Sequence, residues 1–413
     1  MLRARWIGLA TLLLVLAVAP FVPHGGGVNQ AIRRAAEPDR RPLTAGYGRV
    51  TPAFQRTIAR VVADGAAVHV SSRTPARTLA ADLVRCAVFE GQRYCLGTGW
   101  TDRTRRQVLR STAAVAARQA TRPEIQAAGT GDLSLVDSLR QVARLSPRAR
   151  AAAQTAELTE AARSVAKVWL LRHQVQGLPL PAGFLDRHPE VRPATTAVTR
   201  DGTTKVLGSD PAPAPARQGR KHWRDYPTRG VVLDPDQVAP QHRTYWCGPT
   251  SLQMIAWGWS DRQRPQRHWA AELGTTTSGT SITSMVDVVN RSTGWDQAAY
   301  AGPYITLDIR DWSFRKWMLL MARHIVDYRA PVILHPVLLT QFYPYLDHDG
   351  SGHFQVGRGY RKRDGKPPLL GYFEPWNQQR FHPDEPFIDR VQWRTGYKSY
   401  RANQAHFQHN LGV

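Results

Sequence analysis

One cysteine, one histidine and one glutamine of this chain stand in sequence surroundings that could support chemistry. Cys247 opens the run Cys-Gly-Pro-Thr-Ser, and His353 opens the later run His-Phe-Gln-Val. Gln241 lies six positions before the cysteine. In such a set the thiolate attacks a carbonyl carbon, the imidazole moves protons, and the amide N–H groups stabilise the oxyanion. The three residues therefore predict nucleophilic hydrolysis of a carbonyl compound.

The cysteine is expected at the start of a helix. Pro249 suits a first helical turn, because the N–H that it lacks would be unpaired there. The apolar pattern that follows predicts a helix over 249–260. Free N–H groups and the helix dipole should lower the pKa of the Cys247 thiol and favour thiolate. The alternative is a buried cysteine that packs as a small hydrophobe.

Gln241 is predicted to lie in a loop, because the residues between it and Cys247 are polar and aromatic. From that loop its amide could pair with the backbone N–H of Cys247 to hold a developing oxyanion. Gln237 is a second candidate for this role.

The histidine is predicted to open a strand whose alternation turns Phe354 and Val356 to the core and His353 to a cleft. The chain then turns at 363–365 and returns over 369–377. In such a hairpin Glu374 or Asn377 ends beside His353, where either could accept a hydrogen bond from the ring Nδ1–H. Glu374 is favoured, because a carboxylate also stabilises the imidazolium.

A metal is not expected. The run 347–352 resembles the opening of a calcium loop, with side-chain oxygens at its first, third and fifth positions and Gly at its sixth. The twelfth position, which should be Glu, is Arg358. The cysteines and histidines show no zinc spacing, and no other cofactor is predicted.

The other cysteines predict a disulfide. Cys86 and Cys95 flank a short segment that reads as a hairpin turning at 90–91. In that register the two cysteines face each other within bridging range. Two buried free thiols are the alternative. Of the three cysteines in the chain, Cys247 is then the odd one out.

The beginning of the chain predicts export. Arg3 and Arg5 precede an apolar run over 6–22, so residues 1–23 are predicted to be a signal peptide or an uncleaved signal anchor. The rest of the chain is expected to be secreted or extracytoplasmic, or to lie at the cell surface if the anchor is retained.

The chain of 413 residues carries a formal charge of +23, with an isoelectric point near 10.7. A basic surface attracts polyanions, which allows association with an anionic cell wall. The arginines are scattered and no nucleic-acid-binding motif is present, so no nucleic acid partner is expected.

Composition divides the remainder of the chain. Residues 24–44 are predicted to be flexible. Residues 45–178 are predicted to be a mixed α/β, Ala/Arg-rich N-terminal domain of unknown role, with a helix over 147–176 that stops at Gly177. Residues 179–220 are Pro/Ala-rich and read as a linker. Residues 221–413 read helix-rich first (249–260, 281–291 and 311–328) and strand-rich from 330, which is the order typical of an α+β fold.

The motifs described here, with Gly279-Thr-Ser281 and Glu374-Pro375 in the same order, resemble the cysteine peptidases that process bacteriocins with double-glycine leaders, in a secreted stand-alone form. The resemblance covers roughly residues 225 to 395. It implies a papain-like fold with helices packed on an antiparallel sheet. It also implies Cys247 as nucleophile, His353 as general base, Gln241 at the oxyanion hole and an acidic residue that orients the histidine.

Two departures from this family limit what it implies. The family usually has Asp-Pro where this chain has Glu374-Pro375, which bears on the third catalytic residue. The transporter-fused relatives carry membrane and ATP-binding domains, whereas this sequence shows neither a Walker motif nor several apolar spans. Leader removal coupled to export is therefore not implied.

The sequence thus leads to a secreted cysteine peptidase, expected to be a monomer and to act on a peptide or protein substrate. One version of this hypothesis has the enzyme held inactive by its N-terminal region. Two alternatives stay open: a papain-like cell-wall amidase, and a non-catalytic relative that binds peptide or wall polymer.

Overall fold

The computed structural model describes residues 47–121, 129–191, 196–198, 204–206, 220–296, 301–385 and 387–413. The predicted signal segment 1–23 and the predicted flexible segment 24–44 lie outside these residues, as does most of the predicted linker 179–220.

The described residues form both helices and strands. The helices are α2 (Pro52–Ala66), α3 (Ala76–Leu83), α4 (Arg105–Thr121), α6 (Leu135–Arg144), α7 (Pro147–Leu171), α8 (Phe184–Arg187), α10 (Cys247–Ser260), α11 (Gln266–Glu272), α12 (Ile282–Ser292), α13 (Phe314–Val326), α14 (Gln378–Phe381) and α15 (Gly396–Ala405). The short helical turns are η2 (Arg172–Gln176), η3 (Pro189–Val191), η4 (Trp223–Asp225) and η5 (Pro235–Gln237). The strands are β1 (Cys86–Phe89), β2 (Gln92–Cys95), β3 (Gly99–Thr101), β4 (Thr196–Val198), β5 (Thr204–Val206), β6 (Arg229–Val231), β7 (Thr306–Asp308), β8 (Val332–Leu334), β9 (Gln355–Arg363), β10 (Lys366–Phe373), β11 (Val391–Thr395) and β12 (Asn410–Gly412).

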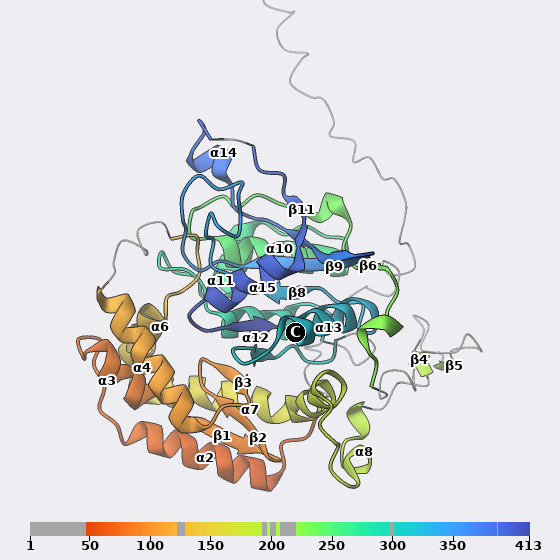
Figure 1. The fold of residues 1–413 in the computed structure, drawn as a ribbon. Helices are drawn as coiled ribbons and strands as arrows, with labels where there is room; N and C mark the ends of the chain where they lie inside the picture. The colour runs from red at the N-terminus through yellow and green to blue at the C-terminus, as the bar shows by residue number, and fades with distance from the viewer. Residues whose placement is uncertain are drawn as a thin grey trace, which may run out of the picture. The chain divides into compact units, whose positions relative to one another are not determined.

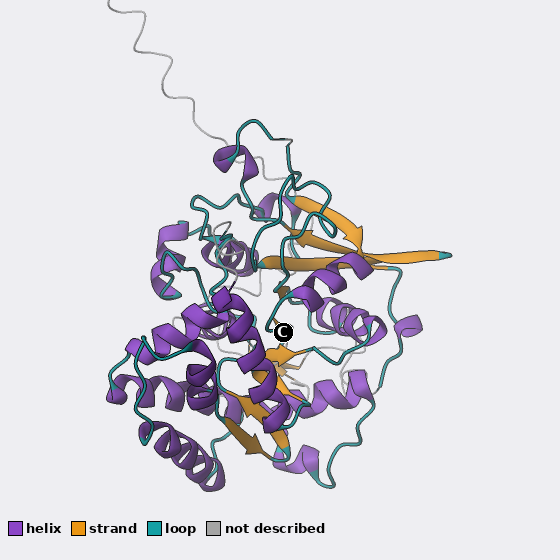
Figure 2. Cartoon of the chain, turned by 60° about the vertical axis from the view of Figure 1, so that its left-hand side comes forward, coloured by secondary structure: helices purple, strands orange, loops and turns teal. Residues whose placement is uncertain are grey.

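Strands from both halves of the sequence form one sheet. Within the described residues its order is β1-β2-β3-β7-β12-β8-β9-β10-β11, and β6 also pairs with β9. The pairings are antiparallel except for β3 with β7. Helices α2 and α7 contact β1, and α10 and α13 contact β9 (Figures 1 and 2). This helical and mostly antiparallel arrangement is α+β, as predicted.

The predicted hairpin and disulfide are confirmed. Cys86 pairs with Cys95 across β1 and β2, and the two are joined by a disulfide. The turn falls at Glu90 and Gly91, which take φ angles of 45° and 78°. Positive φ at both central residues is characteristic of a two-residue hairpin turn whose twist matches the right-handed twist of the strands.

The predicted helices are also found, with shifted ends. Helix α7 begins after Ser146, whose side chain accepts a hydrogen bond from Ala149 N–H. The helical path continues through η2 and ends at Gly177, where φ is 79°. Helix α10 begins at Cys247, two residues before the predicted start, and α13 is shorter than the predicted segment 311–328.

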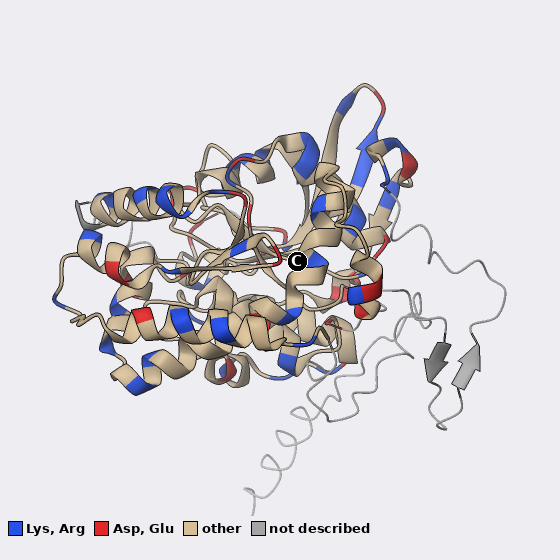
Figure 3. Ribbon diagram, turned by 90° about the horizontal axis from the view of Figure 1, so that it is seen from below, with Lys and Arg blue, Asp and Glu red and all other residues tan. Residues whose placement is uncertain are grey.

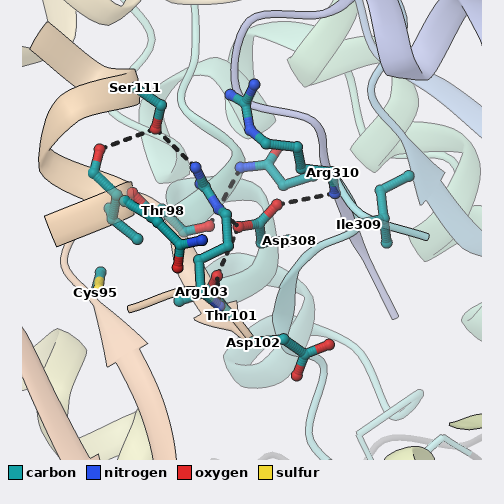
Figure 4. Close-up of polar contacts among 12 residues, drawn as sticks. Cys95, Thr98, Thr101, Asp102, Arg103, Ser111, Asp308, Ile309 and Arg310 are labelled. Carbon is teal, nitrogen blue, oxygen red and sulfur yellow. Dashed lines mark hydrogen bonds and ion pairs between the residues drawn. The ribbon is translucent and has the colours of Figure 1, made fainter. Parts of the chain in front are cut away.

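A buried polar network holds β3 to β7 (Figure 4). One carboxylate oxygen of Asp308 accepts from Thr101 Oγ1 at 2.7 Å and from Arg103 Nε at 2.8 Å. The other accepts from the backbone N–H of Arg310 at 3.0 Å. The side chains of Arg103 and Asp308 are 7% and 2% exposed, so each charge depends on the other for compensation.

The two strands come unusually close at Gly99, where φ is 95° and a Cβ atom would lie 2.3 Å from the carbonyl oxygen of Thr306. Only glycine fits there. The region predicted as an N-terminal domain, 45–178, therefore shares its sheet with the region predicted as the peptidase domain, 221–413.

Lys and Arg occur on many helices and strands in the view of Figure 3. Electrostatic association with an anionic cell wall stays a prediction. None of the described helices combines the length and the apolar character needed to cross a bilayer.

Replacing Asp308 with Ala should destabilise the chain by roughly 3–5 kcal/mol, because Arg103 would stay buried without a counter-charge. Equilibrium urea unfolding measures this loss.

The control is Arg291→Ala on α12. Arg291 pairs with Glu272 and Asp287, but its side chain is 38% exposed. Its removal should cost less than about 1 kcal/mol, as expected of a solvent-screened pair. Equal losses in the two variants would contradict the assigned role of Asp308.

Candidate active site

Cys247 is the first residue of α10 and is fully buried. The start of the helix is fixed from two sides. Thr250 N–H donates to the carbonyl of Trp246 at 3.0 Å. The hydroxyl of Ser251 donates at 3.2 Å to the carbonyl of Phe354, the residue after His353. The first contact lies within the first turn of α10, and the second brings the start of α10 to the start of β9.

The buried thiol of Cys247 lies in surroundings that disfavour its thiolate form. Burial raises the pKa of Cys247 well above its usual value, and the nearby carboxylates of Asp132 and Glu374 raise it further. The backbone N–H groups of Phe354 and Gly248 act in the opposite direction but are outweighed. The expectation that the helix N-terminus lowers this pKa is therefore wrong for the structure as it stands, because desolvation of the thiolate dominates.

His353 and Glu374 form a buried pair. The ring Nε2 lies 2.7 Å from Glu374 Oε1, and neither side chain is exposed. The pairing of β9 with β10 accounts for this, since Val356 faces Phe373. The expected partner was Nδ1, whereas the structure uses Nε2 and leaves Nδ1 without a hydrogen-bond partner. Because Nε2 points to a carboxylate, it carries the proton, and the lone pair of the neutral ring is on Nδ1.

The carboxylate of Glu374 is fixed by three further donors. It accepts from the backbone N–H of Trp376 at 2.9 Å, from Gln355 Nε2 at 2.6 Å and from the hydroxyl of Tyr345 at 2.8 Å. Burial would raise the pKa of Glu374, but the His353 ring, the backbone N–H of Trp376 and the amide of Gln355 outweigh it and lower the pKa. An ionised carboxylate at this position can orient the imidazole and stabilise its charged form.

Asn377, the alternative orienting residue, does not contact His353. Its Nδ2 donates to the backbone carbonyl of Gln241 at 3.1 Å, and its Oδ1 accepts from Arg390 at 2.9 Å. The backbone N–H of Gln241 in turn donates to the carbonyl of Pro375 at 2.8 Å. Asn377 thus fixes the loop of Gln241 to the residues that follow Glu374.

The side chain of Gln241 is buried at the predicted place, but its amide is already engaged. Nε2 donates to the carbonyls of Thr244 at 2.8 Å, Arg243 at 3.0 Å and Thr130 at 3.4 Å. The amide donors that an oxyanion would require are therefore bonded to backbone carbonyls. The third acceptor comes from a segment far away in the sequence, residues 129–133 between α4 and α6.

That segment also carries a residue that the sequence did not reveal. Asp132 lies between His335, at 2.8 Å, and His406, at 2.9 Å. Both rings are fully buried. Asp132 and two of fourteen histidines have no spacing that would link them, so only the fold brings the three together.

The hydrogen bonds around these rings indicate their proton positions. His406 Nδ1 accepts from Gln408 N–H at 3.2 Å, so Nε2 carries the proton and donates to Asp132. His335 Nδ1 lies 2.7 Å from the amide oxygen of Asn410. Its Nε2 lies 2.8 Å from the other carboxylate oxygen of Asp132, outside hydrogen-bond geometry.

The ligand atoms of Asp132, His335 and His406 lie within 4.8 Å of one another, close enough for a metal ion. A proton on His406 Nε2, however, leaves no lone pair there for a metal. The arrangement fits a carboxylate held by two imidazoles better than a metal centre. A second group, Asp347, His348 and Glu385, has the same spacing, with Asp347 exposed.

The cluster should make the fold sensitive to acid. Burial and His335 lower the pKa of His406 to about 4. Between pH 6.5 and about 4 the unfolded chain therefore binds a proton that the folded chain excludes, and stability falls as the pH falls. The loss should be on the order of 3 kcal/mol. Below that window Asp132 adds a second loss: burial would raise its pKa, but the two histidines lower it to about 2.

Urea unfolding at several pH values tests this expectation, with His406→Gln as the comparison. The substitution should make the free energy of unfolding depend less on pH between pH 6.5 and about 4. Identical slopes in the two proteins would show that His406 does not exclude the proton.

A family model matches the part of the chain that holds the candidate site. Residues 236–403 match the family model described as Peptidase_C39 like family. The matched segment contains Gln241, Cys247, His353, Glu374 and Asn377. No curated protein and no solved structure matches the chain. The match supports a papain-like cysteine peptidase domain of the C39 type in the C-terminal part of the chain.

Proposed function

We propose that this chain is an extracytoplasmic cysteine peptidase whose nucleophile is Cys247. The observation that carries the proposal is the buried His353–Glu374 pair at 2.7 Å. Phe354, the residue after His353, is hydrogen-bonded to Ser251 of the helix that begins with Cys247. The family match to residues 236–403 supports the same assignment.

In the proposed reaction His353 Nδ1 takes the thiol proton, and the sulfur of Cys247 attacks the carbonyl carbon of the scissile bond. The negative charge that develops on the carbonyl oxygen is stabilised by the N–H of Cys247 and by the Gln241 amide. The imidazolium then gives its proton to the leaving amine, and a thioester remains on Cys247. Glu374 holds the ring in one tautomer and stabilises its charged form.

Water completes the cycle. His353 accepts a proton from the water, the hydroxide adds to the thioester carbon, and the bond to sulfur breaks. The imidazolium returns its proton to the sulfur, so the products are a carboxylic acid and the regenerated thiol. Tyr345 and Gln355 keep the Glu374 carboxylate in place through both stages.

Replacing Cys247 with Ala should abolish hydrolysis, because no other group can form the thioester. Peptide-library digestion followed by mass spectrometry measures this. Purified peptidoglycan is digested in parallel, and release of wall fragments without peptide cleavage would favour the amidase.

The thermal midpoint of Cys247→Ala is measured as a control for folding. If the folded variant cleaves peptides as fast as the unsubstituted chain does, Cys247 is not the nucleophile.

Replacing Glu374 with Gln should lower kcat/KM by roughly 10²-fold or more, because the ring would lose its charged partner. Asn377→Ala should act differently, since Asn377 contacts the backbone of Gln241 and not the ring. The pH dependence of kcat/KM distinguishes the two roles. It should change in Glu374→Gln and keep its shape in Asn377→Ala. The reverse result would make Asn377 the orienting residue.

A further inference from the structure

The segment 129–133 belongs to the N-terminal half of the sequence but contacts the walls of the candidate active site. On one side Thr130 N–H donates to Ser351 Oγ at 3.0 Å, and Thr130 Oγ1 donates to the carbonyl of Gly352 at 2.7 Å. Gly352 immediately precedes His353. Thr130 is 1% exposed, so this end of the segment is buried against the wall.

On the other side the segment pairs with backbone, as an added strand does. Thr280 N–H donates to the carbonyl of Gly131 at 2.9 Å, and Leu133 N–H donates to the carbonyl of Thr280 at 2.9 Å. The two bonds form a parallel bridge between Asp132 and Thr280. Main-chain pairing of this kind is how proteins bind extended peptides whatever their side chains.

Between these two sets of contacts the segment lies against the backbone of Tyr245 and Cys247. Gly131 has a φ of 114°, and a Cβ atom there would lie 2.6 Å from the carbonyl carbon of Tyr245 and 2.9 Å from the backbone nitrogen of Cys247. Nothing larger than glycine fits so close. The carbonyl of the preceding residue, Thr130, accepts from Gln241. Both proposed oxyanion donors therefore face residues 130–131.

The carboxylate of Asp132 fixes the segment in this place. It is held between His335 and His406, which come from the end of β8 and from the end of α15. His335 also stacks on Phe354, with ring centroids 4.4 Å apart, and Phe354 follows His353. The site that holds the Asp132 carboxylate thus adjoins the candidate catalytic residues.

We propose that the cleft around Cys247 is a groove for an extended peptide with glycine over the cysteine and an acidic side chain in the His335–His406 pocket, and that residues 129–133 are its internal occupant. The chain is then latent until the segment leaves the groove. The proposal rests on the proposed function for its consequence, latency of a peptidase, whereas occupancy of the groove is independent of it.

The rate at which iodoacetamide alkylates Cys247 in the full chain tests occupancy without any substrate. Asp132→Asn removes the charge that the histidines bind, and Gly131→Val cannot sit over Cys247. Each should raise the alkylation rate at least tenfold. Asp137→Asn is the matched control, because Asp137 caps its own helix through Ser134 and should leave the rate unchanged.

Global unfolding is excluded by repeating the measurement at low urea concentrations. Release of a short segment exposes little surface, so the rate should depend weakly on urea, whereas unfolding of the whole chain would give a steep dependence. A steep dependence, or unchanged rates in both segment variants, overturns the proposal.

The pocket is tested with a synthetic peptide of the segment, acetyl-Gly-Thr-Gly-Asp-Leu-amide. It should protect Cys247 of the Asp132→Asn chain from alkylation, and the same peptide with Asn in place of Asp should protect it less. Equal protection by the two peptides would refute the carboxylate pocket.

Peptide hydrolysis by the same variants separates this proposal from the proposed function. Faster alkylation together with faster peptide cleavage supports both. Faster alkylation without any peptide cleavage would support the proposal that the segment occupies the groove of the unsubstituted chain. It would contradict the assignment of the chain as a peptidase.

Discussion

The antiparallel pairing of β9 with β10 is the constraint on which the candidate site depends. It places Glu374, just past the end of β10, beside His353, just before the start of β9. The start of α10 meets the same end of β9 through Ser251. A change of register by one residue would turn the histidine and the carboxylate to opposite faces. The fold therefore fixes the candidate His353–Glu374 pair more firmly than any single contact does.

The sequence predicted well the contacts between residues that are close together in the chain. The Cys86–Cys95 bridge and the His353–Glu374 pair each lie within one hairpin, so strand alternation and turn residues suffice to place them. The start of α10 followed from Pro249 for the same local reason. Even within the hairpin, the sequence could not predict which ring nitrogen of His353 faces Glu374, because this depends on the angle at which the side chain leaves the strand.

Relations between distant parts of the chain could not be predicted. Asp132 meets His406 across 274 positions, and no periodicity marks either residue. The raised pKa of Cys247 could not be predicted for the same reason. The expectation of a reactive thiol assumed a solvent-exposed helix end, whereas Cys247 is buried and Asp132 lies near it. Gly131 gave no signal either, because a glycine in a loop has many explanations until its neighbours are known.

Strand β12 bears on the order in which this chain can fold. Residues 410–412 lie between β7 and β8 in the sheet, and Asn410 also contacts His335. The strands of the Cys86–Cys95 hairpin and the strands next to the candidate site are therefore connected through β12, which is far from the hairpin in the sequence. Without β12 the sheet would have two open edges, and His335 would lack its contact with Asn410. Contacts of such long sequence separation form slowly.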